Sequence, residues 1–172
     1  MVCGWLDALV ARPERGTLLD GAIGQSDATG TALWLSRETI PEAHVTNVKH
    51  DLSVPVSSIP RMIEEGMAEL GTAFPGCVGL IFGHIGDGNL HYNIAMPDEA
   101  GTQALMNQRK AVNDIVYEVV GRLGGSISAE HGVGQQKRDA IKLRKSAVEM
   151  DLMQRVKDAL DPQGIMNPGK VL

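Results

Sequence analysis

Two strand-like segments in the middle of the chain are joined by a very short turn. They span residues 77–85 and 89–96, and Asp87-Gly88 between them is a strong signal for a two-residue hairpin loop. Strands joined so tightly pair in antiparallel fashion, because a parallel pair needs a crossover of a dozen or more residues. We therefore expect an α+β fold in which helices cover one face of an antiparallel sheet, and not a doubly wound parallel sheet.

Further elements are expected on both sides of this hairpin. Apolar residues that recur three or four positions apart predict helices at 26–43, 57–70, 98–123 and 147–160. Additional strands are predicted at 18–23 and 45–54. Asp98 is the expected N-cap of the third helix, and Gly124-Gly125 is its expected stop. Residues 161–172 contain two Pro and two Gly, which predicts an ordered tail and not a helix.

Composition narrows the classes of protein and of partner. The 172 residues are 43% hydrophobic, which is enough for one buried core. The net charge is −5 and basic residues form no cluster, so a nucleic acid or an anionic membrane is not an expected partner. No apolar run approaches the roughly 20 residues that cross a bilayer, and no secretory signal is recognised, so the expected location is cytoplasmic. Cys3 and Cys77 stand far apart and offer neither a disulfide framework nor a thiolate metal site.

The hairpin carries two histidines that point to a metal site. If Asp87 and Gly88 form the loop, His84 faces His91 across the two strands, with β-carbons about 4.5–5.5 Å apart. Two neutral imidazoles at that separation can bind one divalent ion. A solvated sheet face is the alternative interpretation of the same pair.

Alternation along the second strand supports the site. Asn89 and Asn93 share a face with His91, whereas an apolar set points to the opposite, core-facing side: Ile85, Leu90, Tyr92 and Ile94. Solvated faces usually carry Lys, Glu and Thr, so a face of His and Asn beside a glycine-rich turn favours a binding site.

A second polar pair, Glu130-His131, lies in a loop of small residues. Neighbours in a regular strand point to opposite faces, so both side chains reach one pocket only if the backbone is irregular, which Gly132 and Gly134 permit. Glu130 is the natural oxygen ligand beside two histidines, a set that suits zinc or manganese. His131 is then a candidate general base. Without further information, Arg37 and Lys49 are more typical of a solvated face than of a carboxylate site.

Several of these motifs together resemble the C-terminal substrate domain of the FAD-linked 2-hydroxy acid dehydrogenases of the vanillyl-alcohol oxidase type, which include D-lactate, glycolate and D-2-hydroxyglutarate dehydrogenases. The resemblance covers most of the chain and implies a ferredoxin-like α+β domain. The matching stretches are Gln25-Ser26, Leu33-Trp34, Arg37-Glu38, residues 49–55, residues 83–91, residues 129–134 and residues 161–172.

The resemblance also implies roles for individual residues. His84, His91 and Glu130 match metal ligands, and His131 matches the base that takes the substrate hydroxyl proton while hydride passes to FAD. The remaining matches, together with the neighbouring Asn89, give the other expected site residues. Substrate contacts are expected at Arg37, Lys49, Asn89 and Asn93, and a flavin contact is expected at Asn167.

Members of this family carry a larger N-terminal half that holds FAD, and no such half is found in these residues. We therefore expect residues 1–172 to form a substrate- and metal-binding domain truncated at its N-terminus, inactive alone and completed by an FAD-binding domain or chain. A missing strand would leave a sheet edge open and favour a homo-oligomer. The implied electron acceptor is a quinone or an electron-transfer flavoprotein. Two alternatives remain at this point: a metal- or carboxylate-binding module without redox activity, and a metal-dependent hydrolase.

Overall fold

The structure is a computed structural model that describes residues 24–39, 46–84 and 86–172. It divides the chain into two compact units, residues 1–45 and residues 46–172. The described part of the first unit is helix α2 (Asp27–Thr39), which begins where the sequence predicts it. The Oγ atom of Ser26 accepts a hydrogen bond from the N–H group of Thr29 at the start of this helix. The strand predicted at 18–23 and the predicted end of the helix at 40–43 lie outside the described residues.

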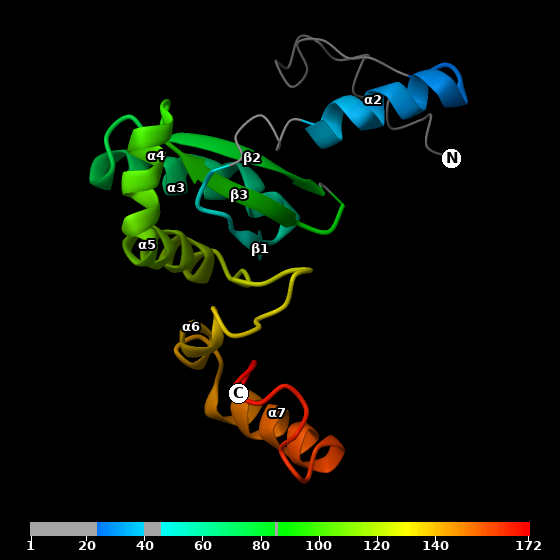
Figure 1. Ribbon diagram of the computed structural model, residues 1–172, viewed down its shortest axis with the longest axis vertical. Coiled ribbons are helices and arrows are strands. Elements are labelled where there is room, and N and C mark those ends of the chain that lie inside the picture. Colours follow the sequence, from blue (N-terminus) through cyan, green and yellow to red (C-terminus); the bar gives the residue numbers. More distant parts are fainter. Residues whose placement is uncertain (1–23, 40–45, 85) are drawn as a thin grey trace. The chain divides into compact units, whose positions relative to one another are not determined.

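The second unit contains a three-stranded antiparallel sheet (Figure 1). Its strands are β1 (Asp51–Ser53), β2 (Val78–His84) and β3 (Asn89–Ala95), in the order β1-β3-β2. Both pairs in the sheet are antiparallel, so the expected α+β class and the antiparallel hairpin are confirmed.

Strand β1 is shorter than the predicted strand at 45–54, and His50 gives the reason. Beyond β1 the pairing with β3 resumes as an isolated bridge between Val48 and Ile94, and the ladder is interrupted between this bridge and β1. The N–H group of Tyr92 still donates to the carbonyl oxygen of His50, 2.9 Å away. In the other direction, the carbonyl oxygen of Tyr92 lies 2.8 Å from the Nδ1 atom of the His50 ring. A side chain therefore replaces one of the two backbone hydrogen bonds of this pair.

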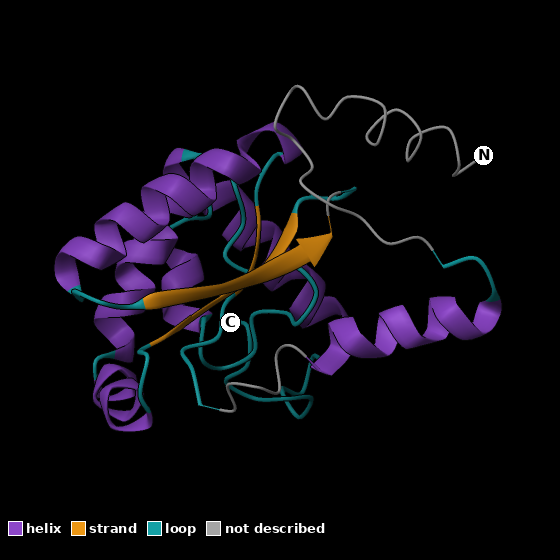
Figure 2. Cartoon of the chain, turned by 90° about the horizontal axis from the view of Figure 1, so that it is seen from above, coloured by secondary structure: helices purple, strands orange, loops and turns teal. Residues whose placement is uncertain are grey.

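Three helices, one between β1 and β2 and two after β3, cover the apolar face of the sheet (Figure 1; Figure 2). Helix α3 (Ile59–Ala73) follows a short 3-10 turn, and α4 (Glu99–Asn107) precedes α5 (Arg109–Arg122). The prediction of a single helix at 98–123 is wrong, because the chain bends at Gln108. The N–H group of Gln108 bonds the carbonyl of Leu105, three residues back, which tightens the turn and starts a new helix axis. Asp98 caps α4 as expected, by accepting a hydrogen bond from the N–H group of Gly101.

The core lies between the sheet and these helices. Sheet residues contribute Leu52, Leu90, Tyr92 and Ile94, and the helices contribute Met62, Leu70, Leu105, Val112, Val116, Val119 and Val120. Helix α3 approaches β3 closely at Gly66, where an added β-carbon would lie 2.5 Å from the hydroxyl oxygen of Tyr92. The predicted core-facing positions Leu90, Tyr92 and Ile94 of β3 are therefore confirmed, and Ile85, which was predicted to face the core as well, lies outside the described residues.

The chain ends with α6 (Arg138–Lys142), α7 (Ala147–Leu160) and an irregular tail. Ser146 and Glu149 form a capping box at the start of α7. The carboxylate of Asp161 accepts hydrogen bonds from the N–H groups of Ile165 and Met166, both 2.9 Å long, so the tail is ordered as predicted. None of the described helices is long and apolar enough to span a membrane.

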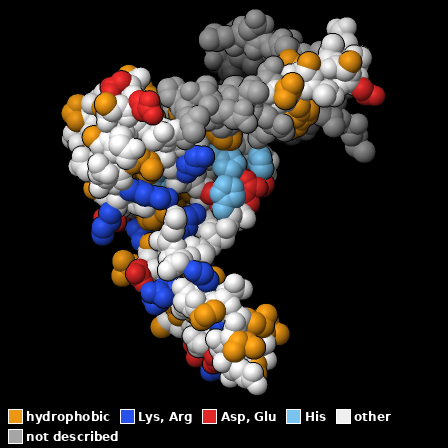
Figure 3. Space-filling model, in the orientation of Figure 1, with side chains coloured by type: hydrophobic (Ala, Val, Ile, Leu, Met, Phe, Trp, Pro, Cys, Tyr) orange, Lys and Arg blue, Asp and Glu red, His pale blue; other side chains and the backbone are white. Residues whose placement is uncertain are grey.

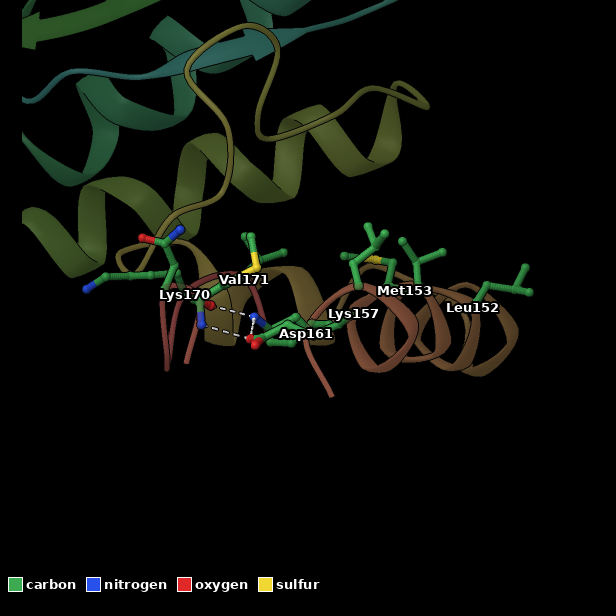
Figure 4. A pocket seen from close by; sticks show the side chains of 11 residues that line it. Leu152, Met153, Lys157, Asp161, Lys170 and Val171 are labelled. Carbon is green, nitrogen blue, oxygen red and sulfur yellow. Dashed lines mark hydrogen bonds and ion pairs between the residues drawn. The ribbon is translucent and has the colours of Figure 1, made fainter. Parts of the chain in front are cut away.

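Helix α7 keeps an apolar side in contact with solvent. Its exposed large side chains are Val148, Leu152, Val156 and Leu160. Leu152, Val156 and Leu160, together with residues of the tail, line an open groove of about 690 Å³ (Figure 4). Lys157 and Asp161 pair among the residues that line this groove (Figure 4). Lys157 also donates to the carbonyl oxygen of Met166, and Asp161 accepts from the N–H groups of Ile165 and Met166, so the pair ties the helix to the tail.

Candidate metal centre

The polar face of the sheet carries the predicted site residues, but the hairpin register differs from the expected one. His84 pairs with Asn89, and His91 pairs with Phe82. The predicted direct pairing of His84 with His91 is therefore wrong by two residues. Because the shift is even, both histidines remain on the same face of the sheet.

The loop between the strands is longer than the Asp-Gly signal predicts, and contacts to the neighbouring chain explain why. The carbonyl oxygen of Gly88 accepts a hydrogen bond from the N–H group of Val54, 3.1 Å long, just beyond β1. A β-carbon on Gly88 would lie 2.0 Å from the Val54 carbonyl oxygen, and the backbone φ of Gly88 is +78°. The side chain of Asp87 caps the N–H group of Asn89, 2.9 Å away. This packing opens the turn to the four residues between His84 and Asn89.

His91 and Glu130 meet at the centre of the polar face. The Nε2 atom of His91 lies 3.0 Å from Oε1 of Glu130, and the ring centroids of His91 and His131 are 5.5 Å apart. Ligand atoms of these three residues and of Asp51 all lie within 4.8 Å of one another. Figure 3 shows histidine side chains gathered beside acidic side chains on this face. The predicted convergence of Glu130 and His131 on the strand histidine is found.

His84 lies beside this cluster and not within it. Its ring centroid is 6.3 Å from that of His91, and its Nδ1 atom lies 3.5 Å from Oδ2 of Asp87. The side chain is 44% exposed. Imidazole and carboxylate donors of this kind suit zinc, so His91 and Glu130 fit a divalent ion, with His84 and His131 on either side as the third donor.

Asp51 is a buried member of the cluster that the sequence analysis missed. It lies opposite His91 in the ladder between β1 and β3 and is only 3% exposed. Burial alone would raise its pKa, but hydrogen bonds from the His131 N–H group and from Asn89 outweigh burial and hold the pKa below its ordinary value. An acidic residue inside a predicted strand was the available signal for it.

Two predicted substrate residues lie on the same face. Val48 pairs with Ile94 and Asp51 pairs with His91, so the antiparallel register places Lys49 opposite Asn93. Lys49 is exposed, whereas Asn93 is buried and its Oδ1 atom accepts a hydrogen bond from the N–H group of His50, 3.4 Å long.

The other predicted contacts are placed differently. Asn89 is buried and its amide donates to Oδ1 of Asp51, so it is engaged within the protein. Arg37 lies in α2, in the first unit, and its side chain is outside the described part of the chain. Asn167, at a backbone φ of +49°, lines the groove beside α7 and is not one of the cluster residues.

His50, which the sequence did not single out, is a structural residue beneath the site. It is 2% exposed, and its two ring nitrogens lie 2.8 Å from the Tyr92 carbonyl oxygen and 2.8 Å from Oδ1 of Asn113. Burial lowers its pKa to about 4, and the hydrogen bonds offset only part of that effect. The ring is therefore neutral at pH 7 and joins β3 to α5.

Comparison of the sequence with known proteins assigns the chain to one family. The model of the C-terminal domain of FAD linked oxidases matches residues 6–171. The chain belongs to this family. Its relatives include a protein of Stutzerimonas stutzeri that is 44% identical over 160 residues, which is 92% of this chain and 34% of the relative. A protein of Xanthomonas citri is 41% identical over the same coverage, and one of Bos taurus is 37% identical over 92% of this chain and 28% of the relative.

All three relatives are named D-2-hydroxyglutarate dehydrogenase, the bovine one with the qualifier mitochondrial. The family resemblance seen in the sequence is therefore confirmed. The chain spans about a third of the length of the curated relatives it matches.

Proposed function

We propose that this chain is the substrate- and metal-binding domain of an FAD-dependent dehydrogenase that oxidises a D-2-hydroxy acid to the 2-oxo acid. The family match supports a part in flavin chemistry. The observation that carries the proposal is the meeting of His91 and Glu130 at 3.0 Å, with the ring of His131 beside them. Residues 1–172 then form one C-terminal domain whose FAD is held mainly by another part of the protein.

In this proposal His84, His91 and Glu130 hold one divalent ion, zinc or manganese. A bound ion of this kind polarises the substrate hydroxyl oxygen and stabilises the negative charge that develops on it. Lys49 and Asn93 face each other across the ladder and offer a cation and an amide for the substrate carboxylate. Arg37, from α2, is proposed as a second carboxylate contact.

His131 is proposed as the base. Its ring lies beside that of His91 and the residue is exposed, so a substrate hydroxyl can approach a ring nitrogen. The hydroxyl proton passes to that nitrogen, while the hydrogen on carbon 2 leaves with its electron pair. FAD supplies the redox chemistry, and Asn167 is proposed to lie near its ring. The electrons pass on to a quinone or an electron-transfer flavoprotein.

The names of the relatives suggest the first substrate to examine, D-2-hydroxyglutarate. A chimera tests the activity directly: the matching third of the Stutzerimonas stutzeri relative is replaced by this chain. We expect the chimera to oxidise D-2-hydroxyglutarate with an artificial electron acceptor. A matched chimera that carries His131→Ala should bind flavin equally and lose oxidation. A folded, flavin-loaded chimera that oxidises no D-2-hydroxy acid would contradict the proposal.

Metal content tests the site independently of turnover. The purified chain is loaded with zinc or manganese, dialysed, and examined by elemental analysis and by its absorbance between about 300 and 600 nm. We expect close to one equivalent of metal and no flavin absorbance. Absence of metal from the folded chain would contradict the proposed ligand set, and a full equivalent of flavin would contradict the placing of FAD in another part of the protein.

A further inference from the structure

Asp51 makes more hydrogen bonds than any other side chain of the polar face. Its Oδ2 atom accepts from three consecutive N–H groups, those of Ala129, Glu130 and His131, at 3.1, 3.0 and 2.8 Å. Its Oδ1 atom accepts from the side-chain amide of Asn89, 3.0 Å away. We infer that Asp51 is the positioning residue of the candidate metal centre, acting through the backbone of the loop that carries Glu130 and His131.

These contacts set Asp51 apart from the proposed metal ligands. A carboxylate offers about four lone-pair positions, and here three N–H groups converge on Oδ2 while one amide donates to Oδ1. Three aligned N–H groups around one oxygen form an anion-binding nest, so the negative charge is satisfied by the protein itself. His91 and Glu130, by contrast, contact each other at 3.0 Å, and their side chains are 16% and 46% exposed.

The loop has few other attachments to the sheet. A backbone bridge joins Ser53 to Ser126, with N–H to oxygen distances of 2.9 and 2.8 Å in the two directions. The Nζ atom of Lys137 lies 3.0 Å from the carbonyl oxygen of Asp51. Between these two attachments the loop makes its nest around Asp51, and Gly132 follows with a backbone φ of +74°. The course of residues 129–131 is therefore set by the Asp51 carboxylate.

The register explains how this positions the site. Because Asp51 pairs directly with His91, the group that holds the loop and the strand histidine lie side by side on one face. Fixing three backbone N–H groups at Asp51 brings the Glu130 side chain to His91 and places the His131 ring beside it. The two adjacent residues therefore reach one site although a regular strand would separate them.

This inference rests on the proposed metal site, and its test separates the two. Zinc affinity is measured by calorimetry, and amide hydrogen exchange is measured by NMR, for the 172-residue chain and for Asp51→Ala, Asp51→Asn and Asp161→Ala. Loss of a hydrogen-bond partner behind a metal ligand typically costs about 10–100-fold in metal affinity. We expect a loss of that size in Asp51→Ala, with faster exchange at Ala129, Glu130 and His131.

Asp51→Asn is the conservative variant, because its neutral oxygen accepts the same N–H groups more weakly. We expect it to bind zinc more tightly than Asp51→Ala and more weakly than the unchanged chain. Asp161→Ala is the matched control: it also removes a buried carboxylate that holds two loop N–H groups, at Ile165 and Met166. That variant should lose exchange protection in the tail and keep zinc affinity within about threefold.

The outcomes distinguish the two proposals. If the unchanged chain binds no zinc, the proposed ligand set fails, while exchange at residues 129–131 still reports whether Asp51 holds the loop. If the chain binds zinc and a folded Asp51→Ala or Asp51→Asn binds it equally well, the positioning role is overturned. Should Asp51→Ala fail to fold, Asp51→Asn decides between these results.

Discussion

The Nε2 atom of His91 lies 3.0 Å from Oε1 of Glu130, so a strand residue and a loop residue meet at one point. If this contact marks the metal centre, removal of either group should abolish tight zinc binding. We expect His91→Ala and Glu130→Gln each to lower zinc affinity by more than about 100-fold. That value is the upper end of the loss that follows removal of a hydrogen-bond partner behind a metal ligand.

Calorimetry with zinc measures this loss. Glu118→Gln is the matched control, since Glu118 is an exposed carboxylate on α5 and should leave zinc affinity unchanged. Zinc binding that survives both His91→Ala and Glu130→Gln would place the ion elsewhere.

A second prediction concerns the third donor. His84 and His131 flank His91, with ring centroids 6.3 and 5.5 Å from it. We expect His84→Ala to weaken zinc binding strongly and His131→Ala to weaken it little, because His131 is proposed as the base. Cobalt substitution, read by the visible spectrum, shows which variant changes the coordination. The reverse pattern would make His131 the ligand and leave His84 outside the site.

The close approach of α3 to β3 predicts the effect of one methyl group. Gly66→Ala would place a β-carbon 2.5 Å from the hydroxyl oxygen of Tyr92, which is fully buried. Overpacking of this kind typically costs about 1–3 kcal/mol of the free energy of unfolding. Gly71→Ala, in the same helix, meets nothing within 4 Å and should stabilise the chain by about 0.4–1 kcal/mol.

Urea unfolding measures both changes. Tyr92→Phe removes the hydroxyl, which is buried and lacks a hydrogen-bond partner within the described residues. Combined with Gly66→Ala it should recover part of the lost stability. Equal effects of Gly66→Ala and Gly71→Ala would show that α3 does not pack against Tyr92 as described.

His50 predicts a pH dependence of stability. Its folded pKa is about 4, below the ordinary 6.5, so the unfolded chain binds more protons between these values. Stability from this residue is therefore fully present above pH 6.5 and falls as the pH drops toward 4, by roughly 3 kcal/mol over the whole window. Urea unfolding with a chelator present, at steps between pH 7 and pH 5, measures the slope.

His50→Gln should flatten this slope even if it lowers stability at every pH. His84→Ala, which changes an exposed histidine outside the core, is measured alongside as the control. An unchanged slope in His50→Gln would mean that other groups cause the acid sensitivity. The Asp51 carboxylate, whose pKa is lowered, keeps its own contribution above the ordinary pKa of Asp and loses it as the pH falls from there toward the lower folded pKa.

The sequence predicted the sheet and the polar face because both depend on alternation alone. Leu90, Tyr92 and Ile94 are buried as expected, and His91 shares its face with Asn89 and Asn93. The exact hairpin register could not be predicted, because it depends on the contact of Gly88 with Val54, which is far from the hairpin in the sequence. The bend at Gln108 was also missed, because no Gly or Pro marks it.

The sequence predicted which types of residue form the site better than it predicted the contacts that hold them in place. Glu130 and His131 stood out as a carboxylate beside an imidazole in a loop of small residues. The partner that holds them, Asp51, lies far away in the chain, and only the pairing of β1 with β3 brings it there. The roles of Arg37, Asn167 and the other proposed contacts stay predictions, as does the cytoplasmic location.

The loop that carries Glu130 is attached to β1 at two places, which matters for moving the candidate metal centre into another protein. Ser53 holds the loop at Ser126 and Asp51 holds it at residues 129–131, two residues apart on one short strand. Any movement of β1 therefore carries Glu130 and His91 together, and their separation is preserved. The smallest unit that carries the centre is then the edge strand β1, its neighbour β3 and the loop at residues 126–131. A protein engineer can graft these three segments together onto another antiparallel sheet.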